Sequence, residues 1–367
     1  MKEPNVKTLM LSQEDLVKVG VQDMPRCVDV IEGVFELLGK GDYLMGGPLE
    51  NEHGQMLWFP DEKRFNIPVT GPDRRFMAMI AYLGGEYNIC GEKWYGSNAE
   101  NKKKGLPRSI LTTVLNDADT GVPFTIMSGN MISAMRTGAV PGVAARHLAR
   151  KGSKVIGAIG AGVINKTCTL AIAAGIDTIE EAVVYDPFPA ASQSYAEEMK
   201  EKLGIKVRMV DTIKEAVEDA DVITIATSGE NFPRIETEWL KKGTLLTMTG
   251  AADMDEEAFH KCTLFADNWK MHQAFIADGN EHPKGFSALE VIAPSYPLIK
   301  LVNDGNIDEK VIHNLGDVVL GKDSGRKDDD EQIIFVTGGM PVHDLAWGMT
   351  LYREAVKQGL GKEFTFF

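Results

Sequence analysis

The sequence predicts an α/β fold, with a doubly wound parallel sheet in the middle of the chain and an α+β domain made from both termini. In the middle of the chain, strand-like apolar runs alternate with helix-like segments. The region before residue 130 instead contains several strand-like runs in succession, and the end of the chain carries a strand, a glycine turn and a long helix. Alternation implies crossover connections and a parallel sheet, whereas successive strands favour antiparallel pairing.

The composition fits a globular protein of two domains. The chain has 367 residues, of which 44% are hydrophobic and 25% are charged, and both fractions are ordinary for this class. No window approaches the ~20 apolar residues that a membrane span needs. The first residues, "MKEPNVKTLMLSQEDL", carry acidic and amide groups where a signal peptide has its apolar core. We therefore expect a cytoplasmic protein that does not enter a membrane.

Charge and residue spacing exclude several kinds of partner. The formal net charge of -14 argues against nucleic acid, whose binding depends on neutralising phosphates. The cysteines form no C-x-x-C pair and the histidines have no metal-ligand spacing, so we expect reduced thiols and no metal site. These residues are Cys27, Cys90, Cys168 and Cys262, and His53, His272, His282 and His343.

The N-terminal region is predicted to form one helix followed by a run of strands. The helix covers "MPRCVDVIEGVFELLGKGD", residues 24–42. No helix-like segment separates the strands that follow, so we expect a mostly antiparallel sheet. These strands are expected within 54–60, 76–83, 87–97, 109–117 and 124–129.

The middle region is predicted to form a parallel sheet with right-handed crossovers. The strands are expected within 153–162, 180–186, 205–211, 221–228, 243–251 and 262–268. The helices between them are expected within 163–175, 190–204 and 212–220.

The C-terminal segment 331–361, "EQIIFVTGGMPVHDLAWGMTLYREAVKQGLG", is predicted to form a strand, a glycine turn and a long helix. We expect this segment to pack back on the N-terminal domain. The sequence thus predicts one domain at 1–130 plus 318–367, and a second at 131–317.

One glycine-containing turn has the features of a dinucleotide-binding loop. The run Gly160-Ala161-Gly162-Val163-Ile164 lies between a predicted strand and a predicted helix. Gly160 permits the tight turn, and Gly162 lets the backbone approach a pyrophosphate, which then lies at the helix N-terminus. The third glycine position is Asn165, a departure from the pattern, so a purely structural turn is the alternative.

An acid follows the next strand at the position expected for ribose binding. Asp186 ends "VVYD", 24 residues after Gly162, near the spacing at which an acid receives the ribose hydroxyls. A carboxylate there repels a 2'-phosphate. The expected cofactor is therefore NAD(H) rather than NADP(H), bound to a Rossmann domain.

Six blocks occur in a recognisable order along the chain. They are "GEKWYGSNAENKKKGLPRS", "TTVLNDADTGVPFTIMSG", "SAMRTGAV", "GAIGAGV", "GDVVLGKDSGR" and "GGMPVHDLAWG". In this order the chain resembles the ornithine cyclodeaminase and mu-crystallin family over nearly its whole length, and its first block is similar to the branch of amino-acid condensing dehydrogenases. The resemblance implies a homodimer built on the N-terminal domain, which also binds the substrate, and a middle domain that binds NAD.

The resemblance implies hydride transfer at the α carbon of an amino acid or imino acid. The family also contains a cyclodeaminase, which converts ornithine to proline and ammonia and returns its hydride, and crystallin-like proteins that bind the nucleotide without turnover. Both remain alternatives to a dehydrogenase.

Two basic residues match the family's central site residues. Arg136 in "SAMRTGAV" matches the arginine that binds the substrate carboxylate; a guanidinium offers two parallel donors, and small neighbours would let ligand and cofactor approach. Lys93 matches the lysine beside the reacting carbon and is the predicted acid or base. The alternatives are an arginine that caps a helix or pairs with an acid, and a strand-end lysine in solvent.

The remaining predicted site residues depend more heavily on the resemblance. Arg75 and Arg108 are candidates for recognising further substrate carboxylates, with surface arginines as the alternative. His343 is a candidate substrate contact, or simply a histidine at a helix N-terminus. The other predicted cofactor contacts are Thr113, Thr137, Thr227, Ser228, Gly250 and Gly339.

Two positions depart from the cyclodeaminase pattern. Leu57 stands where that pattern has a glutamate, and Ala252 stands at its catalytic aspartate. Asp253 follows one residue later and is predicted to be catalytic if the loop shifts by one position. These departures weaken the ornithine alternative more than they weaken dehydrogenase chemistry.

Overall fold

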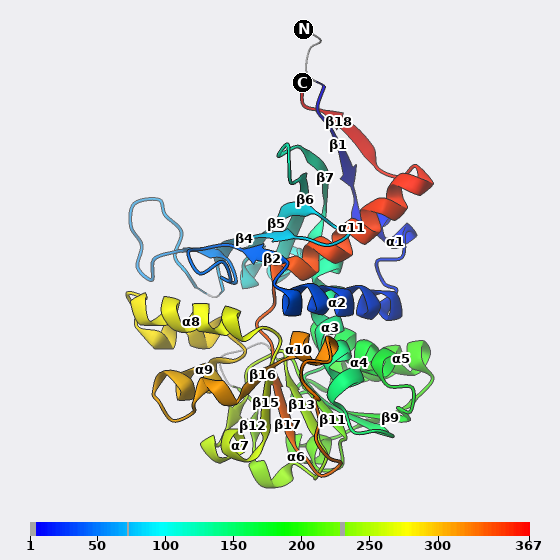
Figure 1. Ribbon diagram of the computed structural model, residues 1–367, viewed down its shortest axis with the longest axis vertical. Coiled ribbons are helices and arrows are strands. Elements are labelled where there is room, and N and C mark those ends of the chain that lie inside the picture. Colours follow the sequence, from blue (N-terminus) through cyan, green and yellow to red (C-terminus); the bar gives the residue numbers. More distant parts are fainter. Residues whose placement is uncertain (1–4, 72, 228–231) are drawn as a thin grey trace. The chain divides into compact units, whose positions relative to one another are not determined.

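The computed structural model describes residues 5–71, 73–227 and 232–367. The chain forms two compact units (Figure 1). Unit 1 comprises Met1–Asp23, Gly41–Ser133 and Met340–Phe367, and unit 2 comprises Met24–Lys40 and Ala134–Gly339. Among the described residues, no helix combines the length and the apolar character that crossing a membrane requires.

Unit 1 is built on one mixed sheet. Its strand order is β18-β1-β7-β6-β5-β4-β2, with β3 also paired to β4, and every pairing except β1 with β7 is antiparallel. The strands are β1 (Lys7–Leu11), β2 (Tyr43–Met45), β3 (Gln55–Trp58), β4 (Arg75–Leu83), β5 (Ile89–Ser97), β6 (Ser109–Asp117), β7 (Pro123–Ser128) and β18 (Lys362–Thr365). This confirms the predicted antiparallel α+β region.

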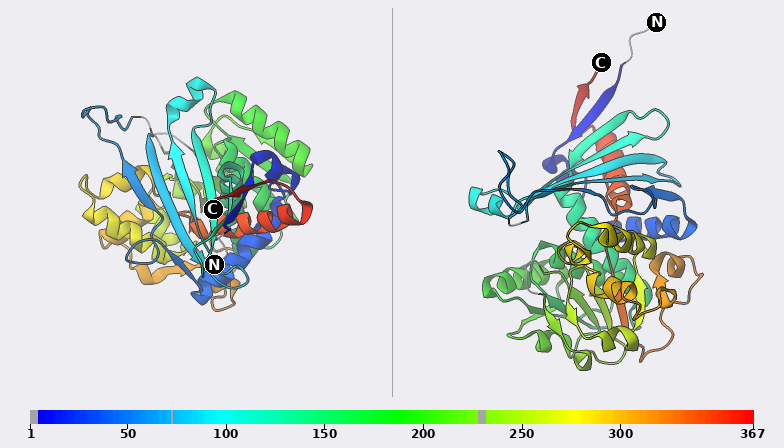
Figure 2. Two further views of the ribbon diagram at one scale, coloured as in Figure 1. Left: turned by 90° about the horizontal axis from the view of Figure 1, so that it is seen from above. Right: turned by 90° about the vertical axis from the view of Figure 1, so that its left-hand side faces the viewer.

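One long helix covers one face of this sheet. Helix α11 (Pro341–Gln358) packs against β4, β5 and β6 (Figure 2). Strand residues alternate between the two faces, so Met79 of β4 is fully buried whereas its neighbour Ile80 is 51% exposed. The unit also contains α1 (Gln13–Lys18) and the 3-10 helix η1 (Ala99–Lys104).

Unit 2 is built on an all-parallel sheet with the order β10-β9-β8-β11-β13-β17-β15-β16. The chain runs outward from β8 through β9 to β10 and then crosses to β11 on the other side of β8, so the strand order reverses between β8 and β11. Right-handed crossovers in the two directions place helices on both faces. The strands are β8 (Val155–Ile159), β9 (Glu181–Tyr185), β10 (Lys206–Met209), β11 (Val222–Ile225), β13 (Leu245–Met248), β15 (Thr263–Ala266), β16 (Ile312–Asn314) and β17 (Ile333–Val336). The predicted doubly wound parallel sheet is confirmed.

Four helices of unit 2 lie where the sequence predicts them, near 24–42, 163–175, 190–204 and 212–220, whereas its four helices after residue 255 lie where none is predicted. The helices of this unit are α2 (Met24–Lys40), α4 (Val163–Gly175), α5 (Pro189–Leu203), α6 (Ile213–Val217), α7 (Glu256–Lys261), α8 (Trp269–Glu281), α9 (Tyr296–Asn303) and α10 (Leu315–Val319). Helix α3 (Gly129–Leu148) contains the boundary between the units. Two short strands, β12 (Arg234–Ile235) and β14 (Asp253–Met254), form a separate parallel pair, and three 3-10 helices complete the list: η2 (Thr237–Trp239), η3 (Phe286–Val291) and η4 (Glu309–Val311).

The unit boundaries differ from the predicted domain boundaries at three places, the smallest of which is residues 131–133, which belong to unit 1. Helix α2 belongs to unit 2 because it packs closely on α10, where a Cβ at Gly39 would lie only 2.6 Å from the Gly316 carbonyl oxygen. The segment 318–339 also belongs to unit 2, because β17 pairs with both β13 and β15 in the parallel sheet. Only the helix that follows β17, not the strand itself, packs on the N-terminal sheet.

Two glycines of α3 serve helix packing: Gly138, within "SAMRTGAV", and Gly142, just after it. A Cβ at Gly138 would lie 2.5 Å from the backbone of Thr167, and one at Gly142 would lie 2.7 Å from the Ala171 side chain. Helix α3 therefore lies against α4 with almost no side chain between them. The sequence predicts that the small residues of this block leave room for ligands, but at Gly138 the close packing of α3 on α4 explains the lack of a side chain.

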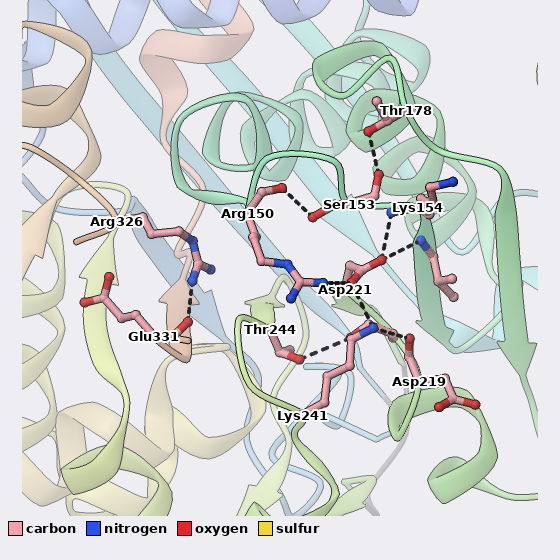
Figure 3. Close-up of polar contacts among 12 residues, drawn as sticks. Arg150, Ser153, Lys154, Thr178, Asp219, Asp221, Lys241, Thr244, Arg326 and Glu331 are labelled. Atoms are coloured by element: carbon pink, nitrogen blue, oxygen red, sulfur yellow. Dashed lines mark hydrogen bonds and ion pairs between the residues drawn. The ribbon is translucent and has the colours of Figure 1, made fainter. Parts of the chain in front are cut away.

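Asp221 joins three elements at the amino edge of the parallel sheet (Figure 3). It accepts hydrogen bonds from the backbone amides of Lys154 (2.7 Å) and Val155 (3.0 Å) and forms ion pairs with Arg150 (3.0 Å) and Lys241 (2.8 Å). Burial alone would raise the pKa of Asp221, but these hydrogen bonds and charges outweigh burial and lower it. This network stabilises the edge opposite to the one that carries the predicted cofactor loop.

Candidate active site

The predicted cofactor residues of unit 2 follow adjacent strands of one sheet. Asp186 follows β9, Gly160 follows β8, Thr227 follows the end of β11, Gly250 follows β13 and Gly339 follows β17. These five strands are neighbours in that order. Ligands of open α/β sheets bind outside the carboxyl ends of the strands, near the point where the strand order reverses. The structure therefore brings these residues together along one edge.

The glycine loop has the backbone shape and the open space that a pyrophosphate needs. Gly160 has φ +92°, which favours glycine, and a Cβ there would lie 2.7 Å from the Ala226 carbonyl oxygen. At Gly162, which begins α4, a Cβ would meet no atom within 4 Å. No side chain caps α4, so the amides of Val163 and Ile164 at its first turn are available to an anion.

Asp186 is fixed directly to this loop. Its carboxylate accepts hydrogen bonds from the backbone amides of Ala161 (2.8 Å) and Phe188 (2.9 Å). The negative charge therefore lies beside the glycine turn. The sequence spacing predicted this proximity, but not the hydrogen bond to Ala161.

Asn165 replaces the third glycine with a hydrogen-bonding side chain. It is fully buried; its Nδ2 donates to the carbonyl oxygens of Gly160 (2.6 Å) and Ile159 (3.0 Å), and its Oδ1 accepts from the Thr224 hydroxyl (2.9 Å). Helix α4 is thus tied to the ends of β8 and β11. Where the fingerprint has a third glycine, this chain holds the turn in place through the hydrogen bonds of the Asn165 side chain.

Lys93 forms a buried ion pair in unit 1. It is 3% exposed, and its Nζ lies 3.2 Å from Asp344 Oδ2 and 3.3 Å from Ser133 Oγ. Asp344 is fully buried in the first turn of α11. The alternative of a strand-end lysine in solvent is therefore wrong, because Lys93 lies in the middle of β5.

Asp344 is not among the site residues predicted from the sequence. It lies in "GGMPVHDLAWG", the block from which His343 is predicted, and both side chains are fully buried in the first turn of the helix. The available signal was an acid in a segment of otherwise apolar residues, since a charge buried there needs a partner.

Thr113 lies directly opposite Lys93 on the neighbouring strand β6. It is fully buried, and its hydroxyl makes no hydrogen bond to any residue that the structure describes. The structure thus places this predicted cofactor contact in unit 1, beside Lys93.

Arg75 and Arg108 converge on one carboxylate. Asp73 pairs with Arg75 (3.1 Å) and with Arg108 (2.6 Å), and it accepts a hydrogen bond from the Ser97 hydroxyl. The Arg75 guanidinium also lies over the Tyr95 ring, 5.7 Å from its centroid. Two guanidinium groups around one carboxylate leave a local excess of positive charge.

Arg136 and Thr137 lie on α3. Arg136 is 4% exposed, which excludes a surface role, while Thr137 is half-buried. Arg136 follows Ser133 by three residues, so both side chains leave the same face of the helix.

Asp253 lies in the short strand β14, where its side chain is 58% exposed and pairs with Arg234 (3.1 Å). Arg234 also binds Glu236 and Asp255. This geometry gives Asp253 a surface ion pair and does not support the predicted catalytic role. Ser228, a predicted cofactor contact, lies outside the described residues.

The two departures from the cyclodeaminase pattern lie in different surroundings. Leu57 is 56% exposed on β3, whereas Ala252 is fully buried. Neither can supply a carboxylate. Within the described part of the chain, no group of three or more histidine, cysteine or acidic side chains could hold a metal ion.

The chain is similar in sequence and fold to several known proteins. The chain is 31% identical, over 80% of its length and 82% of the relative's, to N-((2S)-2-amino-2-carboxyethyl)-L-glutamate dehydrogenase of Staphylococcus aureus. Its fold matches Delta(1)-pyrroline-2-carboxylate reductase of Thermococcus litoralis in complex with NADH and L-proline, with TM-score 0.77, 30% identity and coverage of 97% and 99% of the two chains. It also matches an archaeal alanine dehydrogenase dimer with bound NAD, with TM-score 0.77, 25% identity and coverage of 98% and 100%.

The model of one family spans most of the sequence, matching residues 20–359. This range includes the Gly160 loop, Arg136, Lys93 and Asp344. The chain therefore belongs to the ornithine cyclodeaminase/mu-crystallin family.

Proposed function

We propose that this protein is an NAD-dependent oxidoreductase that acts at the α carbon of an amino acid or imino acid. The observation that carries the proposal is the buried Lys93–Asp344 pair, because a desolvated lysine held by one carboxylate is suited to moving a proton to or from an amine. Similarity to amino-acid dehydrogenases and an imino-acid reductase supports the same class of reaction.

The carboxyl edge of the parallel sheet would hold the cofactor. The amides at the start of α4 would bind the pyrophosphate, and Asp186 would accept the ribose hydroxyls. The bound nicotinamide would supply the hydride acceptor or donor. Asp186 favours NAD(H) over NADP(H), because its charge beside Ala161 repels a 2'-phosphate. Thr227, Gly250 and Gly339 would line the remainder of this edge.

Three residues would manage the reacting part of the substrate. Arg136 would bind the α-carboxylate through two parallel hydrogen bonds. Lys93 would exchange a proton with the amine or imine nitrogen, and Asp344 would hold its Nζ in place. The Thr113 hydroxyl has an unmet hydrogen bond beside Lys93, which suits a contact to a bound ligand.

The two arginines around Asp73 would recognise a second carboxylate. Arg75 pairs with Ser97 across the strands, and Ser97 lies four residues from Lys93 on the same face of β5, a separation of about 13 Å. We therefore propose substrates that carry a carboxylate on the side chain or on an N-linked group.

The exposed sheet face of unit 1 would form a homodimer interface. Four of its apolar side chains are 44–51% exposed: Leu44, Ile80, Trp94 and Ile110. A groove of about 570 Å³ lies on this face between Leu44, Ile80, Glu92 and Val114. Such a face marks an interaction site, and the archaeal alanine dehydrogenase of the same fold is a dimer. We propose a second copy of this chain as the occupant.

The test is a panel of amino acids with NAD+, and of keto acids with amines and NADH. We expect NADH formation or consumption, with dicarboxylic members preferred, and ammonia is measured in parallel. Proline and ammonia from ornithine without net NADH would instead indicate a cyclodeaminase. Tight NADH binding without turnover on any member would indicate a binding protein.

A further inference from the structure

Three buried polar side chains form an array behind the carboxyl edge of the parallel sheet. Asp267 follows β15, His272 lies on α8 and Ser295 precedes α9. His272 Nε2 lies 2.9 Å from Asp267 Oδ1, and His272 Nδ1 lies 2.8 Å from Ser295 Oγ. Each residue is at most 1% exposed.

The order serine, histidine, aspartate is that of a hydrolytic triad, but burial excludes that use. Ser295 is completely inaccessible, and a nucleophile must reach its substrate. The three side chains therefore have a structural role, which is to hold neighbouring segments of the protein in place.

The Asp267 carboxylate is saturated by donors from three segments. Its Oδ1 accepts from His272 and from the Asn268 amide (2.8 Å), and its Oδ2 accepts from the amides of Gly338 (2.9 Å) and Gly339 (3.4 Å). Burial alone would raise the pKa of Asp267, but the hydrogen bonds from His272 and these amides outweigh it and lower the pKa. The carboxylate thus stays charged and holds the Gly338–Gly339 turn.

Helix α8 fixes the same turn by packing. A Cβ at Gly338 would lie 2.1 Å from Met271 Cε and 3.2 Å from the Phe275 ring, and Gly339 has φ +76°. Since Met271 and His272 are neighbours on α8, one helix sets the turn both by contact and through Asp267.

This turn lies toward one end of the proposed cofactor site. Asp186 and the Gly160 loop follow β9 and β8, whereas Gly338 and Gly339 follow β17, three strands from β8. Strands of a parallel sheet are about 4.8 Å apart, so the turn lies roughly 14 Å from the glycine loop along the sheet. An extended dinucleotide whose pyrophosphate lies on the glycine loop reaches this turn with its nicotinamide half.

We propose that Asp267 and His272 are positioning residues that set the Gly338–Gly339 turn against the nicotinamide half of the cofactor, with Ser295 orienting His272. This inference rests on the proposed function, because it requires NAD(H) on that edge. Changing Asp267 or His272 should therefore weaken the binding of the nicotinamide half of the dinucleotide and leave the binding of its ADP-ribose half unchanged.

The test compares the affinities of purified variants for NADH and for ADP-ribose, which lacks the nicotinamide. We expect D267N and H272A to weaken NADH binding at least tenfold while the Kd for ADP-ribose changes less than twofold. H272Q, which can keep an N–H toward Asp267, should recover part of the NADH affinity. D221N is the matched control: it alters a buried carboxylate that binds backbone amides at the opposite edge, and it should leave the ratio of the two affinities unchanged.

Two further variants keep the test decisive if D267N or H272A fails to fold. G338A pushes the turn against Met271 with Asp267 intact, and S295A removes only the outer hydrogen bond; both should weaken NADH more than ADP-ribose. Equal changes for both ligands, or no change, would overturn the inference. Failure of the unaltered protein to bind either ligand would instead overturn the proposed NAD site.

Discussion

Lys93 Nζ and Asp344 Oδ2 lie 3.2 Å apart with both side chains buried, and they come from segments 251 residues apart in the sequence. The strand that carries Lys93 and the helix that carries Asp344 pack against each other in unit 1. A buried pair of this kind is costly to disrupt, and the proposed function uses it to transfer a proton.

Replacing Lys93, alone and together with Asp344, should distinguish its effect on catalysis from its effect on stability. K93M should lower kcat by a factor of about 10²–10⁴, the usual contribution of general acid–base catalysis, while NADH affinity survives. It should also lower the free energy of unfolding by about 3–5 kcal/mol, because the Asp344 charge loses its lysine partner. The double variant K93M/D344N should regain stability but not activity, as measured by urea unfolding and NADH absorbance. Retained turnover in K93M would remove Lys93 from the mechanism.

Removing the charge of Asp186 should alter cofactor choice. D186S should lower kcat/KM for NAD+ at least tenfold and reduce the preference for NAD+ over NADP+, because the repulsion of a 2'-phosphate disappears. Steady-state kinetics with both cofactors measures the ratio. D211N, an exposed acid just beyond the neighbouring strand β10, is the control and should leave the ratio unchanged. An unaltered preference in D186S would show that cofactor choice is made elsewhere.

Arg108 should discriminate between substrates by their number of carboxylates. R108Q removes one of two cations around Asp73, so kcat/KM should fall about tenfold or more for dicarboxylic substrates, in keeping with 1.5–3 kcal/mol for a charged hydrogen bond, and less for monocarboxylic ones. R353Q is a control, since Arg353 of the same unit pairs with Glu86. A uniform loss for every substrate would assign Arg108 a structural role alone.

Low pH should weaken the hydrogen bonds and ion pairs that the Asp221 carboxylate forms. Because the folded-state pKa of this carboxyl is lowered, its contribution to the free energy of unfolding is complete above the unfolded value of about 3.9 and is lost as pH falls through the folded-state pKa. D221N should therefore be less stable than the unaltered protein at pH 7, by about 1–3 kcal/mol, with the difference shrinking below pH 4. Urea unfolding at several pH values measures it. A difference independent of pH would contradict the ionic origin.

Charge on the exposed sheet face should prevent self-association. I80D and W94E should give monomers by analytical ultracentrifugation, because each buries a carboxylate in an apolar interface. V311D places the same charge on an apolar residue of unit 2 that is 52% exposed, and it should stay dimeric. Dimers that persist in both sheet variants would move the interface to another surface.

Local patterns in the sequence predicted the elements well and their assembly less well. Apolar patterns identified the central strands of both sheets (β3 to β7 in unit 1; β8 to β11, β13, β15 and β17 in unit 2), because each pattern depends on which neighbouring residues are buried. They did not identify the strands β1, β2, β16 and β18 or the helices α7 to α10. They also could not assign α2 or β17 to a unit. Those assignments depend on Gly39 meeting Gly316 and on β17 entering between β13 and β15, and such contacts between distant segments leave no local periodicity.

In the candidate site, too, features set by local spacing could be predicted from the sequence, whereas contacts between distant segments could not. The Gly160 turn and Asp186 were predictable because their geometry depends on local spacing. Asp344 was not, since its partner Lys93 is distant in sequence, and the hydrogen bonds of Asn165 could not be read from a departure alone. His272 has no metal-ligand spacing in the sequence, and only the fold reveals its contact with Asp267.

Unit 1 is assembled from three separate stretches of chain, the last of which begins at Met340. Strands β4 to β6 are synthesised long before α11, the helix that covers them. On the ribosome, unit 2 can therefore complete its sheet while unit 1 still lacks its final helix. Lys93 acquires Asp344 only when the end of the chain has emerged, so a protein shortened before residue 341 would have a complete parallel sheet in unit 2 and no Lys93–Asp344 ion pair in unit 1.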